Sequence, residues 1–278
     1  MAQQGPKKEL QIQEFECIGR KADELIIHAP GILALGDESL LPPSGSATDP
    51  GGVLGALCLR GDVVTATYPT HEFYPSYIAR QLADMIVERA PHYKRLNIIG
   101  SSMGGLLAVD ALAELSDLSL APKVRPILVD SPFGASDLMS GGNIAAPVLR
   151  WTRLGQLPLL QRFPIKGGPP KPHEVQVDLD FDEVKRVMMA RMEGFTFGTW
   201  AQDMAYMDWR FPAAALPFMG DAHYVRCILG NETVRETAVG GWMGAVPGMK
   251  LHEVASPHCG YAQQPEEFIR AFAQILAA

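Results

Sequence analysis

A Gly-x-Ser-x-Gly pattern occupies residues 100–104, Gly-Ser-Ser-Met-Gly. It directly follows an apolar segment, residues 96–99, and precedes a stretch with helical spacing. Glycine on either side permits a sharp strand-to-helix turn that holds the Ser102 hydroxyl at the carboxyl end of a strand. A serine presented in this way can attack an acyl carbon. Ser102 occupies the serine position of the pattern and Ser101 does not, so Ser102 is the candidate nucleophile.

A general base must accompany this serine, because a serine hydroxyl is a poor nucleophile near neutral pH. Among the seven histidines, His258 follows the last strand-like segment and precedes a C-terminal helical segment. A loop at that point emerges at the same edge of a parallel sheet as Ser102, so His258 is the predicted base. Four others fit less well because they lie within a strand, at the opposite edge or in the long segment before residue 224: His252, His92, His173 and His223. His28 ends the first strand and is expected to shape the loop behind it.

The elements that must position these residues alternate along the chain. Short apolar segments, typical of strands covered on both faces, occur at residues 25–29, 62–68, 95–100, 125–130, 224–230 and 249–254. Helical spacing occurs at residues 77–88, 106–115 and 265–276. This alternation predicts an α/β fold with a doubly wound, mostly parallel sheet.

One long interruption breaks the alternation. Residues 131–223 begin with a turn-rich stretch, include the stiff segment 166–172, and are rich in methionine and in tryptophan, with Trp151, Trp200 and Trp209. We interpret them as a helical lid inserted into a core made of residues 1–130 and 224–278. Such a segment can pack as its own small core, or it can form an adaptable apolar wall over a binding cleft.

Composition excludes several classes of partner. The chain has 278 residues and a formal net charge of −7, without a basic block, which argues against nucleic acid and anionic lipid. Its apolar runs are shorter than a membrane span, and no apolar stretch follows the N-terminal charges as in a signal peptide.

The four cysteines, Cys17, Cys58, Cys227 and Cys259, are far apart and form no Cys-x-x-Cys pair. We therefore expect reduced cysteines and a cytoplasmic location. The three His-Glu pairs at residues 71, 173 and 252 lack a second histidine four positions on, and no phosphate loop is present. Neither a metal nor an organic cofactor is expected.

Three features together resemble the α/β-hydrolase superfamily: residues 98–105 (IIGSSMGG), residues 256–261 (SPHCGY) before a terminal helix, and residues 26–31 (IIHAPG) after the first strand. The resemblance implies an α/β-hydrolase fold in which residues 131–223 are the lid. It also implies a Ser-acid-His order along the chain and two backbone N–H donors, an oxyanion hole, that stabilise the reacting oxygen. One donor would be Met103. Pro30 has no N–H, so the second would come from Gly31 or Ile32.

The resemblance leaves two candidates for the acid that orients His258. Most of the family places this acid after the strand matched by residues 224–230, where Glu232 lies. The thioesterase branch places it at the end of the strand after the nucleophile helix, where Asp130 lies. We favour Asp130, although an aspartate there can also cap the following turn.

The expected function is that of a serine hydrolase that cleaves a carboxylic ester or thioester, and the expected partner is a small-molecule, apolar acyl substrate. Two alternatives stay open. The same residues could perform other chemistry, namely C–C bond hydrolysis, acyl transfer or peptide cleavage. Alternatively, the chain could be a non-catalytic protein that uses the cleft to hold a small ligand.

Overall fold

A computed structural model of the chain describes residues 10–15, 17, 23–31, 52–68, 74–134, 137, 206, 208–229, 234–261 and 264–277. Most of the predicted lid, Ile32 and Glu232 lie outside these residues.

The described strands form one sheet in the order β1-β3-β2-β4-β5-β6-β7. Every neighbouring pair is parallel except β1 and β3, which are antiparallel. The predicted doubly wound, mostly parallel sheet is therefore confirmed. The strands are β1 (Gln11–Phe15), β2 (Glu24–Ala29), β3 (Asp62–Thr67), β4 (Arg95–Ser101), β5 (Val124–Val129), β6 (His223–Cys227) and β7 (Lys250–Val254).

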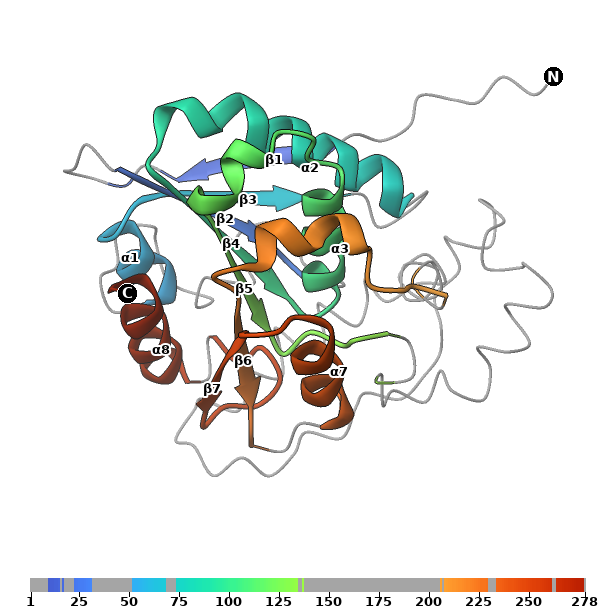
Figure 1. The fold of residues 1–278 in the computed structure, drawn as a ribbon. Helices are drawn as coiled ribbons and strands as arrows, with labels where there is room; N and C mark the ends of the chain where they lie inside the picture. The colour runs from blue at the N-terminus through green and yellow to red at the C-terminus, as the bar shows by residue number, and fades with distance from the viewer. Residues whose placement is uncertain are drawn as a thin grey trace, which may run out of the picture.

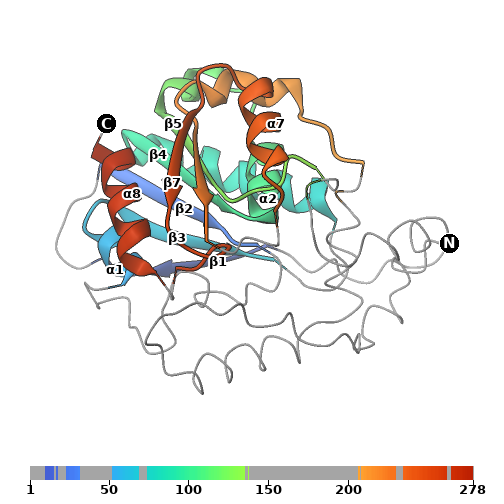
Figure 2. The same cartoon turned by 90° about the horizontal axis from the view of Figure 1, so that it is seen from below.

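Helices cover both faces of this sheet (Figures 1 and 2). One face packs against α2, α3 and the 3-10 helix η7, and the other against α1 and α8. The central strands β2, β4 and β5 are almost wholly buried between the two layers, which explains their continuous apolar sequences. The helices are α1 (Val53–Cys58), α2 (Pro75–Arg89), α3 (Met103–Ala113), α7 (Thr237–Ala245) and α8 (Pro265–Ala277), with 3-10 helices η2 (Ala90–His92), η3 (Leu118–Lys123) and η7 (Ala213–Met219).

The expectation of four unpaired cysteines is wrong for two of them, because Cys17 and Cys58 form a disulfide with a Cα–Cα distance of 4.9 Å. Antiparallel pairing of β1 with β3 sets Phe15 opposite Val63, and α1 ends just before β3 begins. The two cysteines, distant in sequence, are thereby brought together. The disulfide also removes the argument from reduced cysteines on which the expected cytoplasmic location rested.

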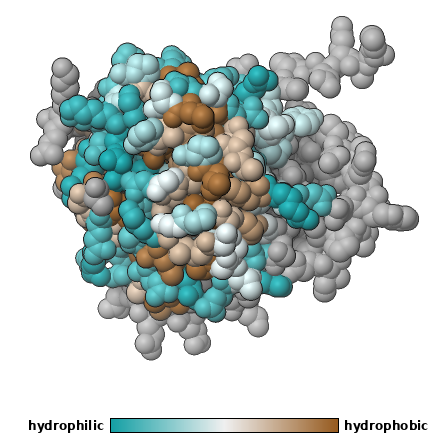
Figure 3. Space-filling view, viewed as in Figure 1, coloured by the Kyte–Doolittle hydropathy of each residue, from teal (hydrophilic) through white to brown (hydrophobic). Residues whose placement is uncertain are grey.

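The surface in the view of Figure 3 carries apolar residues over η3 and η7, where Leu118 and Leu216 are exposed, and polar residues on the side of α8. Within the described ranges, none of the helices has the length and hydropathy needed to span a bilayer.

Candidate active site

Ser102 lies in a strained turn between β4 and α3. Its φ is 52° and its ψ is −127°, a backbone conformation that non-glycine residues rarely adopt. The Ser102 N–H donates to the carbonyl oxygen of Val129 at 2.8 Å, which holds this turn against the end of β5. The side chain remains partly exposed. Strain of this kind persists only where the surroundings enforce it, and it is concentrated at functional sites.

The glycines on either side of Ser102 allow this turn to pack closely. A side chain at position 100 would place its Cβ 2.5 Å from the Cα of Gly105, in the first turns of α3. A Cβ at position 104 would overlap the carbonyl oxygens of Ala29 and Pro30. The pattern around Ser102 therefore reflects two close contacts, one between β4 and α3 and one between α3 and the loop after β2.

That loop passes directly beside Ser102. A Cβ on Gly31 would lie 3.0 Å from the Ser102 Cβ and 3.6 Å from its Oγ, so a side chain at this point would be tightly packed against the serine. The Tyr68 hydroxyl donates to the carbonyl oxygen of Pro30 and lies 3.1 Å from that of Gly31, which holds the loop in place. Met103 begins α3, where backbone N–H groups have no acceptor within the helix. The predicted donors Gly31 and Met103 thus flank Ser102, whereas Ile32 lies outside the described residues.

His258 is paired with Asp130. The imidazole Nδ1 lies 2.5 Å from Asp130 Oδ2, across a separation of 128 residues in sequence. Since the carboxylate accepts the Nδ1 proton, Nε2 of the neutral ring is left as the basic nitrogen. Of the two predicted acids, the structure brings Asp130 to the imidazole, and Glu232 lies outside the described residues.

Asp130 is itself held firmly at the end of β5. It is 1% exposed and has a φ of 47°. Its backbone N–H donates to Val225 at 2.8 Å, and its Oδ1 accepts from the Cys227 N–H at 3.4 Å. Both contacts come from β6, so the neighbouring strand fixes the carboxylate that faces His258.

The turn that carries His258 lies against the turn that carries Ser102. The Cys259 thiol is 3.7 Å from the carbonyl oxygen of Val129, the same oxygen that accepts the Ser102 N–H. The Cys259 thiol also contacts the backbone of Ser102, and burial raises its pKa well above the usual value. This thiol is therefore a packing group, and it brings the residue next to His258 up to the candidate nucleophile.

The discounted histidines lie elsewhere. His223 and His252 lie on the neighbouring strands β6 and β7 and stack on each other, with Nδ1 of His223 2.9 Å from Nε2 of His252. His92 is exposed in η2, and His71 and His173 lie outside the described residues. His28, the residue expected to shape the loop after β2, is fully buried.

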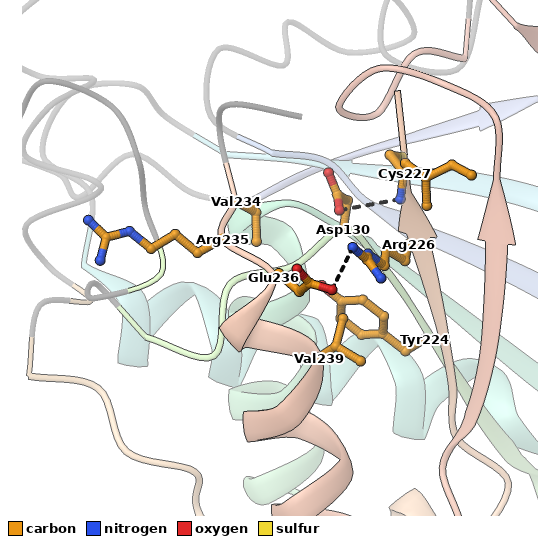
Figure 4. A pocket seen from close by; sticks show the side chains of 9 residues that line it. Asp130, Tyr224, Arg226, Cys227, Val234, Arg235, Glu236 and Val239 are labelled. Atoms are coloured by element: carbon orange, nitrogen blue, oxygen red, sulfur yellow. Dashed lines mark hydrogen bonds and ion pairs between the residues drawn. The ribbon is translucent and has the colours of Figure 1, made fainter. Parts of the chain in front are cut away.

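A cavity of about 260 Å³ lies beside Asp130 (Figure 4). It lies between the end of β6 and the start of α7, and Arg226 pairs with Glu236 across it at 3.0 Å. The side chain of Arg235 points away from it. The lining residues are Asp130, Tyr224, Arg226, Cys227, Ile228, Val234, Arg235, Glu236 and Val239.

The free energy of unfolding is expected to fall as the pH drops from about 6.5 to about 4.5. Burial lowers the pKa of His28 to about 3 and that of His223 to about 4, so the unfolded chain binds these protons first. Burial raises the pKa of Asp110 to about 6, so the folded chain binds this proton first. This carboxyl therefore cancels the effect of one of the two histidines on stability. The net slope is on the order of 1 kcal/mol per pH unit, measurable by chemical denaturation across this range.

A His28→Asn variant should show a flatter dependence, because one of the two buried histidines is gone. His92→Asn is the matched control, since His92 is exposed in the folded protein and its replacement should leave the slope unchanged. A wild-type stability that does not vary across this pH range would contradict the expectation.

Solved structures of other proteins have a similar fold. No curated protein matches the sequence. The enol-lactonase of Burkholderia xenovorans LB400 is 17% identical with a TM-score of 0.59, covering 97% of this chain and 96% of that one. The esterase RhEst1 of Rhodococcus sp. ECU1013 is 13% identical with a TM-score of 0.60, covering 97% and 94%. A hydrolase of Oleispira antarctica is 10% identical with a TM-score of 0.61, covering 98% and 95%.

The sequence itself matches a family model over residues 40–271, which is most of its length, and that model describes the alpha/beta hydrolase family. The sheet order, the turn at Ser102 and the structural neighbours agree with this match. The chain therefore belongs to the alpha/beta hydrolase family, and it has the α/β-hydrolase fold.

Proposed function

We propose that this protein is a serine hydrolase that cleaves a carboxylic ester or thioester through a covalent acyl-enzyme. Ser102 is the nucleophile, His258 the general base and Asp130 the acid that orients it. The observation that carries the proposal is the 2.5 Å hydrogen bond from His258 Nδ1 to Asp130, on a turn that packs against the strained turn of Ser102.

In the first half of the reaction, Ser102 Oγ attacks the acyl carbon while His258 Nε2 takes the hydroxyl proton. The resulting imidazolium is stabilised by the buried carboxylate of Asp130. The tetrahedral intermediate then collapses. The bond from the acyl carbon to the alcohol or thiol breaks, and His258 delivers its proton to the departing oxygen or sulfur.

The negative oxygen of the intermediate needs donors that are already in place. The N–H of Met103 at the start of α3 is one, and the N–H of Gly31 or Ile32 is the other. The position of Gly31 close beside Ser102, and the hydrogen bond of Tyr68 to Pro30, support this loop as the second source.

In the second half, a water molecule loses a proton to His258 Nε2 and attacks the acyl carbon. The Ser102 ester bond breaks, His258 returns the proton to Ser102 Oγ, and the carboxylic acid is released. Side chains and backbone groups of the chain perform every step, so the proposal includes no metal or organic cofactor.

We propose that the part of residues 131–223 between Phe133 and Trp209 forms a lid over this site, whereas η7 (Ala213–Met219) and His223 of β6 belong to the core with residues 1–130 and 224–278. Phe133 near the start of this segment and Trp209 near its end are 5.8 Å apart between ring centroids, and both pack against Trp242 of α7. The chain therefore leaves and re-enters the core at one place. The methionine and tryptophan content of the segment favours an apolar acyl group.

The function is tested with a panel of p-nitrophenyl esters of increasing acyl length and the matching acyl-CoA thioesters. We expect turnover of at least one series, with the highest kcat/KM for an apolar acyl chain. Hydrolysis of neither series, combined with tight binding of an acyl ligand, would instead favour the non-catalytic alternative. Turnover of peptides or C–C substrates alone would assign the same residues to another reaction.

A further inference from the structure

A chain of three buried polar side chains lies directly behind the candidate site. The Oγ of Ser101 is 3.0 Å from Nε2 of His28 and 2.6 Å from the hydroxyl oxygen of Tyr261. These residues are respectively 2%, 0% and 3% exposed. The Tyr261 ring also packs against Phe268 of α8, with ring centroids 4.4 Å apart. The hydroxyl of Ser101 is thus fully engaged and turned away from solvent.

Each of these three residues lies on a different segment of the proposed active site. His28 precedes the loop that places Gly31 beside the nucleophile, Ser101 is adjacent to Ser102, and Tyr261 follows His258 on the same turn. The two hydrogen bonds therefore connect three segments: the end of β2, which leads into the oxyanion loop at Gly31, the turn that carries Ser102, and the turn that carries His258. The turn that carries His258 is the farthest from the others in sequence, since Ser101 and Tyr261 are 160 positions apart.

The hydrogen bonding of these buried side chains and their surroundings is incomplete. Within the described part of the protein, Nδ1 of His28 has no hydrogen-bond partner, and neither does Oγ1 of Thr65, the residue opposite His28 in the β2–β3 register. Buried polar groups without partners cost free energy, and a polar network with unpaired members stabilises a core less than apolar side chains of similar volume. Fixing geometry is the better explanation for polar residues at these positions.

We infer that Tyr261, Ser101 and His28 are positioning residues that hold His258 and the oxyanion loop in register with Ser102. This inference rests on the proposed function. If the Ser101–Tyr261 hydrogen bond is removed, the His258 turn keeps its aromatic packing but loses its polar connection to the nucleophile turn. Small displacements of a general base from its nucleophile lower the rate of the chemical step more than they alter substrate binding.

The test is Tyr261→Phe, which deletes one hydroxyl and keeps the ring packed on Phe268. We expect kcat for the best ester to fall between about 10-fold and 100-fold with KM unchanged. The melting temperature should stay within about 4 °C of the wild type. Ser101→Ala removes the same hydrogen bond from the other side and also the one to His28, so the two substitutions together should cost about as much as Ser101→Ala alone.

Tyr93→Phe is the matched control. It also deletes a tyrosine hydroxyl that makes one side-chain hydrogen bond, to Asp62 at 2.8 Å. This bond lies near the amino ends of β3 and β4, whereas Ser102 follows the carboxyl end of β4. The variant should leave kcat unchanged. If Tyr261→Phe has the same kcat as Tyr93→Phe, or if kcat falls only in proportion to lost folded protein, the inference is wrong.

A second readout does not depend on turnover. The Nδ1 proton of His258, hydrogen-bonded to Asp130, should give a low-field proton resonance that broadens in Tyr261→Phe and Ser101→Ala and persists in Tyr93→Phe. If the wild type hydrolyses no ester, the proposed function fails while this comparison still tests the network. If Tyr261→Phe and Ser101→Ala both leave the resonance and kcat unaltered, the inference about positioning residues is wrong, while the proposed function still stands.

Discussion

Ser102→Ala is expected to abolish ester hydrolysis, with a fall in kcat on the order of 10⁶-fold, as found when the serine of a comparable triad is removed. The neighbouring hydroxyl of Ser101 cannot substitute, because this side chain is buried and bonded to His28 and Tyr261. The loss should appear in kcat, while binding of the substrate's acyl chain persists. Burst and steady-state kinetics with a p-nitrophenyl ester measure both quantities.

Covalent labelling gives an independent test of the same prediction. A fluorophosphonate should attach to Ser102 of the wild type, visible as a mass increase on the peptide that carries it, and should not attach to Ser102→Ala. Ser101→Ala serves as the neighbouring control, since its nucleophile is intact and it should still be labelled. Equal labelling of wild type and Ser102→Ala would refute the nucleophile assignment.

Asp130→Asn is expected to lower kcat by about 10⁴-fold, the cost of the same change in a serine protease triad. The carboxylate now accepts the Nδ1 proton of His258 at 2.5 Å. An amide NH₂ in its place would donate to Nδ1, so that the imidazole proton would move to Nε2, the nitrogen that must act as base. The amide is nearly isosteric with the carboxylate, so the fold should be retained.

Glu232→Gln is the comparison that separates the two candidate acids. It removes one negative charge from the other position that the family pattern allows, and we expect only a modest change in kcat. A large fall for Glu232→Gln with near-normal activity for Asp130→Asn would reverse the assignment.

The central sheet could be predicted from the sequence because its strands are buried on both faces. Continuous apolar runs such as those of β2, β4 and β5 leave little alternative once helical segments separate them. Other elements gave no such signal, among them β1 and α7. β1 is a short edge strand with only two apolar residues, and α7 contains three glycines, which have low helix propensity.

The site was predictable where local sequence dictates local geometry and ambiguous elsewhere. The turn at Ser102 follows from its flanking glycines, and the position of His258 follows from the strand before it. The contact of His258 with Asp130 depends on the register of β5 and β6, which no local pattern encodes. The hydrogen bonds of His28, Ser101 and Tyr261 likewise join segments whose proximity becomes evident only in the folded chain.

The disulfide between Cys17 and Cys58 encloses β2 and the loop that follows it in a covalent ring spanning 41 positions. A single proteolytic cut anywhere in that ring would leave the two fragments still attached. The amino-terminal fragment could then diffuse away only after reduction of the sulfur–sulfur bond, so a nicked molecule would keep its parts at high local concentration and could reassemble.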